Sequence, residues 1–262
     1  MLEQILVYER DAFLWLNGLH TPYLDRFMWI YSGNPAWIPL AVFILFALCY
    51  RRPWRESVLL ILALALAITL CDQFASGFCK PFFARFRPTR HPDFMHVVQT
   101  VISPRTGEPY LSGRYGFMSS HAANTFGFAL FTSLLFRHRV YTVCLFLWAT
   151  AMSYSRIYLG VHFLSDIIPG ALFGLLFSWL SFRLYVRVRP RFIPNTPLLP
   201  YPAVVPRAIL CGMLLTHATI TLIAAWWVRY VRPGFVPPFS YVEERPTPRR
   251  EKTFRASRGV RD

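Results

Sequence analysis

Charged residues are scarce in this chain of 262 residues, where Asp, Glu, Lys and Arg together make up 16%. A soluble globular domain carries roughly 25% charged residues. Hydrophobic residues make up 55% and aromatic residues 17%, and the mean hydropathy is +0.36. Because Trp and Tyr favour the two faces of a bilayer, this composition excludes an ordinary soluble domain and indicates a membrane protein.

Acidic residues are scarcer still, with 13 Asp and Glu against 28 Lys and Arg and a formal net charge of +15. In a soluble protein this excess would suggest nucleic-acid binding. Here the basic residues lie mostly in short segments between apolar runs, which is typical of positive loops on the cytoplasmic side of a membrane. Three clusters stand out: Arg51, Arg52 and Arg55; Arg137 and Arg139; Arg183, Arg187, Arg189 and Arg191. The charge pattern therefore predicts no nucleic-acid partner.

Cysteine patterns and a signal peptide are also missing. The five cysteines form no C-x-x-C pair and have no regular spacing, which predicts no disulfide framework. Charged residues interrupt the N-terminal segment where a signal peptide needs an apolar core. One helical face of residues 2–16 carries Leu2, Ile5, Leu6, Phe13 and Leu16. We expect residues 1–20 to form an amphipathic helix that lies on the membrane surface.

Long apolar runs are what the chain does have. Six of them, at about residues 24–50, 57–78, 120–136, 141–158, 162–186 and 208–228, are each close to the ~20 residues that cross a bilayer. We therefore predict an all-α, polytopic membrane bundle of about six transmembrane helices. Gly33, Pro35 and Pro39 should bend the first half of the first span.

The three arginine clusters lie between spans one and two, three and four, and five and six, so they share one side of the membrane. If that side is cytoplasmic, the long loop at residues 80–118 and the starts of spans three and five face outside. That loop holds five prolines and little periodicity, and loops of this length are usually functional or disordered. The basic C-terminal tail does not fit the rule that positive segments stay on the cytoplasmic side, because this topology places the tail outside.

Polar and charged residues gather at the outer ends of these spans. Lys80 and Arg87 follow the second span, Ser119, Ser120 and His121 begin the third, Ser155 and Arg156 end the fourth, and His162 and Asp166 begin the fifth. The three cations suit a phosphoryl group, which spreads negative charge over three oxygens during transfer and matches guanidinium forks. Free N–H groups at the start of the third span would add to this. Both serines can bind phosphate or cap the helix, and we assign Ser120 mainly to capping.

His162 and Asp166 are spaced i, i+4, which predicts that they share one helical face. Asp166 can accept a hydrogen bond from one ring nitrogen of His162 and leave the other as a nucleophile. His121, on another helix, can donate a proton to the leaving oxygen. Water would then hydrolyse the phosphohistidine.

These segments resemble the three signature motifs of the phosphatidic-acid phosphatase type 2 superfamily. The first, K-x6-R-P, is met by Lys80, Arg87 and Pro88, and the third, S-R-x5-H-x3-D, by Ser155, Arg156, His162 and Asp166. The second, P-S-G-H, reads Met118-Ser119-Ser120-His121, so its Pro and Gly are replaced. The resemblance covers about residues 24–188.

The resemblance implies a helical bundle whose externally facing site hydrolyses a phosphate ester without metal or cofactor. It implies His162 as nucleophile, His121 as acid and Asp166 as the orienting residue. It implies phosphate binding by Lys80, Arg87, Ser119 and Arg156. With it we divide the chain into the amphipathic helix at 1–20, a catalytic transmembrane domain at 21–190, a connector and sixth helix at 191–230, and a basic tail at 231–262 that we expect to be disordered.

Other interpretations of single residues stay in view. His121, His162 and Asp166 could hold zinc, but the three nearby cations would repel a metal. Asp72, inside the second span, is interpreted as structural, holding a neighbouring helix by hydrogen bonds. His91 and His96, in the long loop, are expected to be solvated.

The leading function is a membrane lipid phosphatase of the bacterial cytoplasmic membrane, with its site on the outer face. Undecaprenyl diphosphate, lipid A, phosphatidylglycerol phosphate and phosphatidic acid all present a terminal phosphate. The Arg-rich loop and basic tail slightly favour the first two. A vanadate-dependent haloperoxidase is one alternative, although that branch is soluble. A non-catalytic phospholipid-binding protein is the other, although intact His121, His162 and Asp166 argue against a decayed site.

Overall fold

The computed structural model describes residues 2–104, 106–194 and 201–230, so the predicted disordered tail at 231–262 lies outside the described residues. The helices are α1 (Leu2–Asn17), α2 (Pro22–Ser32), α3 (Ile38–Cys49), α4 (Trp54–Asp72), α5 (Lys80–Phe83), α6 (Ser120–Phe136), α7 (Arg139–Tyr158), α8 (Leu164–Phe192) and α9 (Val204–Tyr230). A π-helical segment, Gln73–Cys79, joins α4 to α5, and a 3-10 helix, Asn34–Trp37, joins α2 to α3. The prediction of an all-α fold is confirmed.

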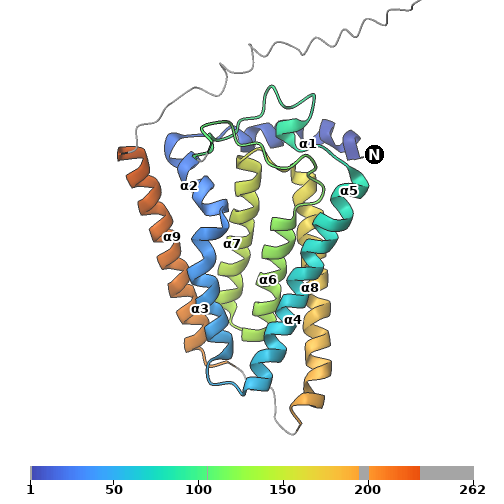
Figure 1. The fold of residues 1–262 in the computed structure, drawn as a ribbon, viewed down its shortest axis with the longest axis vertical. Helices are drawn as coiled ribbons and strands as arrows, with labels where there is room; N and C mark the ends of the chain where they lie inside the picture. Colours follow the sequence, from blue (N-terminus) through green and yellow to red (C-terminus); the bar gives the residue numbers. More distant parts are fainter. Residues whose placement is uncertain (1, 105, 195–200, 231–262) are drawn as a thin grey trace, which may run out of the picture.

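Three helices are long and apolar enough to cross a membrane: Trp54–Phe83, α8 and α9. The bent pair of α2 with Asn34–Cys49 makes a fourth. Length and composition thus support three to four spans, fewer than the six predicted. The two predicted spans that are missing from this set are α6 and α7. α6 has only 17 residues and packs against α4, α7 and α8 (Figure 1), and α7 carries an arginine near each end.

The predicted bend in the first span is confirmed. α2 ends at Ser32, the chain turns at Gly33 and Pro35, and α3 continues at an angle of 68°. Proline has no backbone N–H to donate, so the helical ladder is interrupted where this turn occurs. The break leaves Ser32 and Asn34 at the outer end of the bundle, next to the candidate site.

Helices α6 and α8 cross closely because small residues meet along their contact. A Cβ added to Gly174 would lie 2.2 Å from the carbonyl oxygen of Ala123, and one on Gly170 would lie 2.6 Å from that of Ser119. Small residues allow two backbones to approach within this distance. The backbone N–H of Ser119 also donates to the carbonyl of Asp166 at 3.0 Å. The start of α6 is thereby fixed beside the start of α8.

The N-terminal helix α1 lies across one end of the bundle (Figure 1). Leu6 and Phe13 are buried there against Phe94, Ile157 and Phe163. The predicted amphipathic helix is therefore present, but these apolar residues pack on the protein. Exposed apolar side chains on this helix are Ile5, which was predicted on the apolar face, and Val7, Tyr8 and Trp15. The long segment between α5 and α6 lies over the same end of the bundle.

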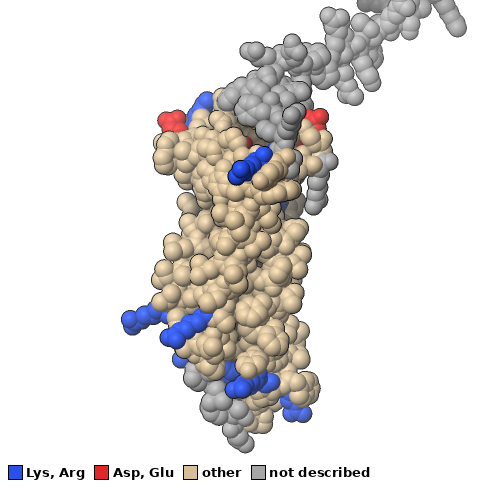
Figure 2. All heavy atoms as spheres, turned by 90° about the vertical axis from the view of Figure 1, so that its left-hand side faces the viewer, with Lys and Arg blue, Asp and Glu red and all other residues tan. Residues whose placement is uncertain are grey.

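Charge is distributed unevenly along the long axis of the molecule. On the face drawn in Figure 2, basic side chains gather towards the lower end and the acidic ones lie at the upper end. The lower end of Figure 1 holds the α3–α4 connection, the α6–α7 connection and the end of α8, where the three arginine clusters occur. The prediction that these clusters share one end of the bundle is confirmed.

Candidate active site

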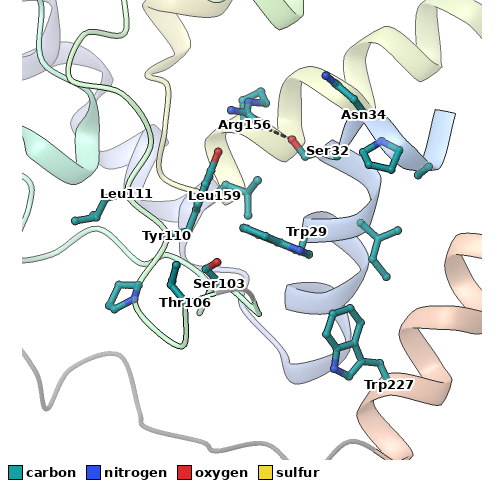
Figure 3. Close-up of a pocket in the computed structure, with 15 residues that line it drawn as sticks. Trp29, Ser32, Asn34, Ser103, Thr106, Tyr110, Leu111, Arg156, Leu159 and Trp227 are labelled. Atoms are coloured by element: carbon teal, nitrogen blue, oxygen red, sulfur yellow. Dashed lines mark hydrogen bonds between the residues drawn. The ribbon is translucent and has the colours of Figure 1, made fainter. Parts of the chain in front are cut away.

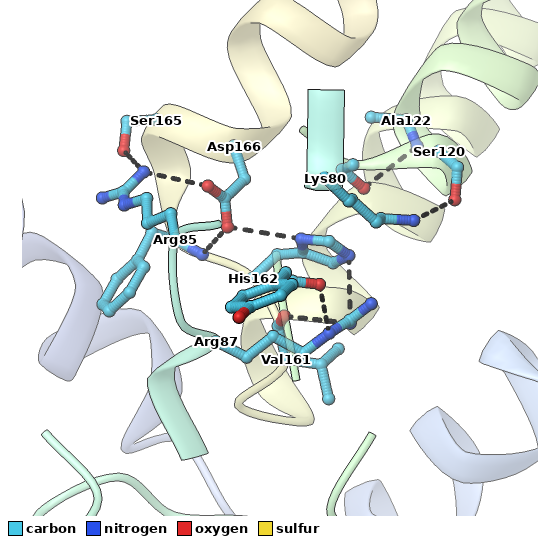
Figure 4. A network of polar contacts seen from close by, with 12 residues as sticks. Lys80, Arg85, Arg87, Ser120, Ala122, Val161, His162, Ser165 and Asp166 are labelled. Atoms are coloured by element: carbon cyan, nitrogen blue, oxygen red, sulfur yellow. Dashed lines mark hydrogen bonds and ion pairs between the residues drawn. The ribbon is translucent and has the colours of Figure 1, made fainter. Parts of the chain in front are cut away.

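The three predicted segments meet at the end of the bundle that α1 crosses. A cavity of about 300 Å³ opens there. Its lining residues are Ser32, Asn34, Arg87, Tyr110, Ser112, Ser120, His121, Arg156 and His162. Lys80 reaches the cavity wall through Ser120, and Asp166 lies behind His162 (Figure 4). Among the predicted site residues, the structure therefore brings together side chains up to 86 positions apart, from Lys80 to Asp166.

His162 lies in the turn before α8, not on the helix, so the prediction of one shared helical face is wrong. Phe163 is the N-cap, and Asp166 closes a capping box by accepting from the backbone N–H of Phe163 at 3.0 Å. The other contact of Asp166 Oδ2 is Nδ1 of His162, at 3.3 Å. The i, i+4 spacing therefore does bring His162 and Asp166 together as predicted, but through a helix cap and not along one helical face.

The ring of His162 is oriented by its two nitrogens. Nδ1 faces the Asp166 carboxylate, which favours the tautomer with the proton on Nδ1. Nε2 then carries the lone pair and lies 3.3 Å from Nη1 of Arg87 (Figure 4). Burial, followed by the charges of Arg87, Arg156 and Lys80, holds the pKa of His162 well below its usual range. The imidazole is therefore neutral at physiological pH, as a nucleophile must be.

Arg87 is fixed by the backbone around it. Its Nε donates to the carbonyl of Tyr115 at 3.0 Å and its Nη1 to that of Val161 at 3.2 Å. Burial, and then repulsion from Arg156, lowers the pKa of Arg87 to about 10, which leaves the guanidinium charged at neutral pH. A cation that is already held in place loses little entropy when a phosphate arrives.

Arg156 and Lys80 supply the other two cations. Arg156 is 5% exposed, its Nη1 donates to Ser32 Oγ, and its Nε is buried without a hydrogen-bond partner among the described residues. Lys80 Nζ donates to Ser76 Oγ at 2.8 Å and Ser120 Oγ at 3.3 Å. A buried, unsatisfied N–H next to a polar cavity favours an anionic ligand there.

The structure assigns the cap of α6 to the other serine than the one predicted. Ser119 is the N-cap of α6, and its hydroxyl accepts from the backbone N–H of Ala122 at 3.3 Å. Ser120 lines the cavity and accepts from Lys80. The prediction that Ser120 mainly caps the helix is therefore wrong. The cap register differs by one residue, a difference that sequence alone rarely resolves.

Arg85 and Glu9 were not among the predicted site residues. Arg85 is 2% exposed, and its Nη1 lies 2.9 Å from Asp166 Oδ1. Its Nη2 lies 3.0 Å from Oε1 of Glu9, on α1. Ser165 joins both groups, because it accepts from Arg85 Nη1 at 2.7 Å and donates its backbone N–H to Glu9 Oε2 at 2.8 Å. The sequence does hold one signal for Glu9. It lies seven residues, or two helical turns, after Leu2, so a charged residue falls on the apolar face of the amphipathic helix.

Predictions were also made for three residues outside the site, and two of these residues differ from expectation. His91 is buried, with Nε2 2.8 Å from Glu3 Oε2, so the prediction that it is solvated is wrong. His96 is exposed, as predicted. Asp72 Oδ1 accepts from Ser76 Oγ, on the same continuous helical segment, at 3.5 Å. This contact continues through Ser76 to Lys80, so Asp72 belongs to a chain that ends at the site, whereas we expected it to hold a neighbouring helix.

Comparison with known proteins supports a common origin for this arrangement. The profile described as the PAP2 superfamily matches residues 56–190. The lipid A 4'-phosphatase of Porphyromonas gingivalis is 42% identical over 192 residues, which are 73% of this chain and 79% of that protein. The lipid A 4'-phosphatase of Bacteroides thetaiotaomicron is 34% identical over 197 residues, 75% and 85% of the two chains.

A solved structure is similar in fold. It is the PAP2 type phosphatidylglycerolphosphate phosphatase of Bacillus subtilis, which is 19% identical with a TM-score of 0.52. The match covers 71% of this chain and 88% of that chain. At this identity the likeness concerns the arrangement of the helices. It agrees with the bundle in which α4, α6, α7 and α8 surround the cavity end.

Proposed function

The chain belongs to the PAP2 superfamily of membrane lipid phosphatases, and from this premise we propose that it removes the 4'-phosphate of lipid A. The choice of substrate rests on two relatives, the lipid A 4'-phosphatases at 42% and 34% identity, which match this chain over most of their length. Among the four lipids that the sequence left open, lipid A is the one that both relatives indicate.

In the proposed reaction, Nε2 of His162 attacks the phosphorus atom. The new N–P bond forms as the bond from phosphorus to the 4'-oxygen of the sugar breaks, and the leaving oxygen takes a proton from His121. Nδ1 of His162 keeps its proton and donates it in a hydrogen bond to Asp166 Oδ2, 3.3 Å from Nδ1. Asp166 thereby stabilises the positive charge that develops on the ring.

A second step returns the enzyme to its starting state. Water attacks the phosphorus atom of the phosphohistidine, and His121 takes one of its protons. The N–P bond breaks, its electron pair returns to Nε2, and inorganic phosphate leaves. The same side chain acts as acid in one step and base in the next, as covalent hydrolysis requires.

The cations around the cavity stabilise the charge that spreads over the phosphoryl oxygens. Arg87 and Arg156 line the cavity, and Lys80 approaches through Ser120. We assign phosphate binding to these three and to Ser120. Ser119 contributes by capping α6, which keeps the free N–H groups of the first turn directed at the site.

The chain is a multi-pass membrane protein, and we propose that all six predicted spans cross the bilayer. α6 and α7 then cross as the inner helices of the bundle. The arginine-rich end faces the cytoplasm, and the cavity faces the outer side of a bacterial cytoplasmic membrane. The haloperoxidase alternative fits less well, because the resemblance places that branch among soluble proteins.

The test is phosphate release by the purified protein in detergent. We would offer lipid A, undecaprenyl diphosphate, phosphatidylglycerol phosphate and phosphatidic acid, each with EDTA present, and identify the lipid A product by mass spectrometry. We expect loss of the 4'-phosphate, and a decrease of roughly 10⁴-fold in kcat for His162→Asn. His96→Asn, which changes an exposed histidine, is the matched control.

Two outcomes would contradict the proposal at different levels. Release from another lipid, with lipid A left intact by a folded protein, would reject the substrate and keep the phosphatase. Full activity of His162→Asn on lipid A would reject the phosphohistidine mechanism.

A further inference from the structure

A second and larger cavity adjoins the phosphate cavity. Its volume is about 660 Å³, and the two cavities share Ser32, Asn34, Tyr110 and Arg156 as walls. Figure 3 shows this second cavity from close by, with Tyr110 near Arg156 and Trp227 towards the other end. A group attached to a phosphate bound at Arg156 would therefore extend into this space. The mechanism described above does not use it.

The larger cavity combines aromatic faces with polar groups. Trp29 and Tyr110 meet edge to face, with ring centroids 5.0 Å apart. Trp227 adds a third ring from α9. Polar groups come from Ser103, Thr106, Asn34 and the two residues Ser32 and Arg156 at the junction with the phosphate cavity. Small-molecule sites commonly have this composition and a volume of roughly 300–1,000 Å³.

Most of the aromatic wall lies outside the part of the chain that the superfamily profile matches. Trp29 and the α2–α3 turn precede residue 56, and Trp227 follows residue 190. The phosphate-binding cations Lys80, Arg87 and Arg156 all lie within residues 56–190. The aromatic wall therefore lies mostly in segments outside the profile that contains the phosphate site, and selectivity for the rest of the substrate is expected to reside there.

We propose that this cavity binds the hexosamine ring that carries the phosphate. The inference rests on the proposed function, because the ring is that of the lipid A head group. A pyranose presents apolar C–H faces and a rim of hydroxyl groups. The aromatic rings suit the faces, and the hydroxyl and amide side chains suit the rim. A glycerol head group would leave most of these contacts unmade.

An acyl chain is a poorer occupant for physical reasons. It would cover the side-chain amide of Asn34 without offering it a hydrogen bond, and burying a polar group unpaired costs free energy. Acyl chains can instead lie against the exposed apolar flanks of α8 and α9, for example at Leu172 and Leu222.

Two neighbouring tryptophans of α9 provide a matched test. Trp227 lines the cavity, whereas Trp226 is 58% exposed and contacts Tyr230. With p-nitrophenyl phosphate as substrate, we would measure inhibition by glucosamine 4-phosphate and by glycerol 1-phosphate. We expect the unchanged protein to bind the sugar phosphate more tightly, and Trp227→Ala to weaken that inhibition about 10-fold. Inhibition by glycerol 1-phosphate should stay the same in Trp227→Ala, and Trp226→Ala should change neither constant.

The outcomes separate this inference from the proposed function. Equal weakening of both inhibitors in Trp227→Ala, or no weakening at all, would overturn the sugar site. Failure of the unchanged protein to hydrolyse lipid A, while it still prefers the sugar phosphate as inhibitor, would reject lipid A as the substrate and keep a hexosamine phosphate site.

A second inference rests on the buried contacts of Arg85, which are independent of this cavity. We infer that Glu9 and Arg85 are positioning residues for His162. Arg85 lies between two carboxylates, with Nη2 3.0 Å from Glu9 and Nη1 2.9 Å from Asp166, and the chain of contacts ends at His162. Its guanidinium also stacks 4.8 Å above the ring centroid of Phe163, the N-cap of α8.

This arrangement makes α1 part of the active site. Asp166 is completely buried, and a buried carboxylate needs a fixed cation to stay ionised and correctly turned. Arg85 has several rotatable bonds; Glu9 fixes Nη2 on its far side, and Ser165 accepts from the Nη1 that also pairs with Asp166. Removing the Glu9 charge should therefore let Arg85 and Asp166 turn, and His162 would lose its orientation.

The matched pair for this test is Glu9 and Glu3, both on α1. Glu3 pairs with His91 at 2.8 Å and is 58% exposed. We expect Glu9→Gln to lower kcat about 10-fold with KM within about two-fold, while Glu3→Gln changes neither. Arg85→Lys should retain more activity than Arg85→Met, because it keeps the charge. An unchanged kcat in Glu9→Gln with a lower melting temperature would assign Glu9 to stability alone and overturn the inference.

Discussion

Two buried arginine–carboxylate networks hold opposite ends of the bundle together. Glu56, near the start of α4, pairs with Arg189, near the end of α8, at 2.7 Å. At the other end, Arg85 follows the helical segment that continues α4 and pairs with Asp166, at the start of α8. α4 and α8 run in opposite directions, so each network fastens one end of the pair (Figure 1).

The two networks differ in where their contacts lead. Glu56 accepts from Nε and Nη2 of Arg189 and from the hydroxyl of Tyr185, and these contacts join α4 to α8. Asp166 accepts from Arg85 and also faces the ring of His162. The same chemistry therefore serves two purposes: at one end it fixes helices, and at the other it also fixes a reactive side chain. Matched substitutions at the two ends can separate these purposes.

The largest effect is expected for Asp166→Asn. An amide of equal size keeps the packing, but it no longer stabilises the charge that develops on His162. We expect kcat to fall by roughly 10³- to 10⁴-fold, the size of effect found when the carboxylate of a catalytic triad becomes an amide. Steady-state kinetics in detergent would measure it, with circular dichroism to verify the fold. A decrease below ten-fold would mean that the Asp166 charge does not act on His162.

The corresponding change at the other end is Glu56→Gln. It leaves the Arg189 guanidinium buried without its carboxylate, which costs about 3–5 kcal/mol in buried pairs of this kind. We expect a lower melting temperature, with kcat per folded molecule unchanged at a temperature where the variant remains folded. Thermal unfolding followed by intrinsic fluorescence, with activity measured on the same sample, checks both parts. Loss of kcat in a folded Glu56→Gln sample would show that the two ends are coupled.

A smaller effect is expected where the first turn of α6 crosses α8. A Cβ on Gly174 would lie 2.2 Å from the carbonyl oxygen of Ala123, so Gly174→Ala must separate the helices. We expect a loss of about 1–3 kcal/mol in stability and a lower kcat, because α6 carries His121. Gly212→Ala is the control, since its Cβ would meet side chains and no backbone: Leu40 at 3.1 Å and the ring of Phe43 at 3.5 Å. Equal effects of the two substitutions would reject a special role for the α6–α8 crossing.

The sequence predicts some parts of this architecture well, for identifiable physical reasons. Apolar runs and prolines act locally, so the helices and the bend at Gly33 and Pro35 follow from them. Motif spacing placed Arg87, Arg156 and His162 correctly around one cavity. All of these signals depend on residues that are near one another in the chain.

Other parts depend on contacts that are far apart in the chain, and these were missed. Glu9 and Arg85 are separated by 76 positions and meet only after α1 folds over the bundle. The roles of Ser119 and Ser120 depend on which residue ends the loop, a shift of one position that tertiary packing decides.

The smallest expected effect concerns pH and again separates the two ends. Burial, and then Arg87, Arg156 and Lys80, hold the pKa of His162 well below the ~6.5 of an unfolded chain. Between these two values the unfolded state binds a proton that the folded state does not, so folding stability falls as the pH decreases below about 6.5. The His162 contribution is at most about 1.4 kcal/mol per pH unit.

A comparison of two variants isolates this contribution from other titrating groups. The difference in melting temperature between the unchanged protein and His162→Asn should shift in favour of the variant as the pH falls from 7 to 5.5. His96→Asn, at an exposed position, should show no such shift. Both substitutions remove one histidine, so a general effect of net charge is the same in the two variants. What remains is the change of the melting-temperature difference with pH, and it reports the burial of His162. A difference that stays constant with pH would mean that His162 titrates normally in the folded protein, which would contradict a site where three cations keep the nucleophile neutral.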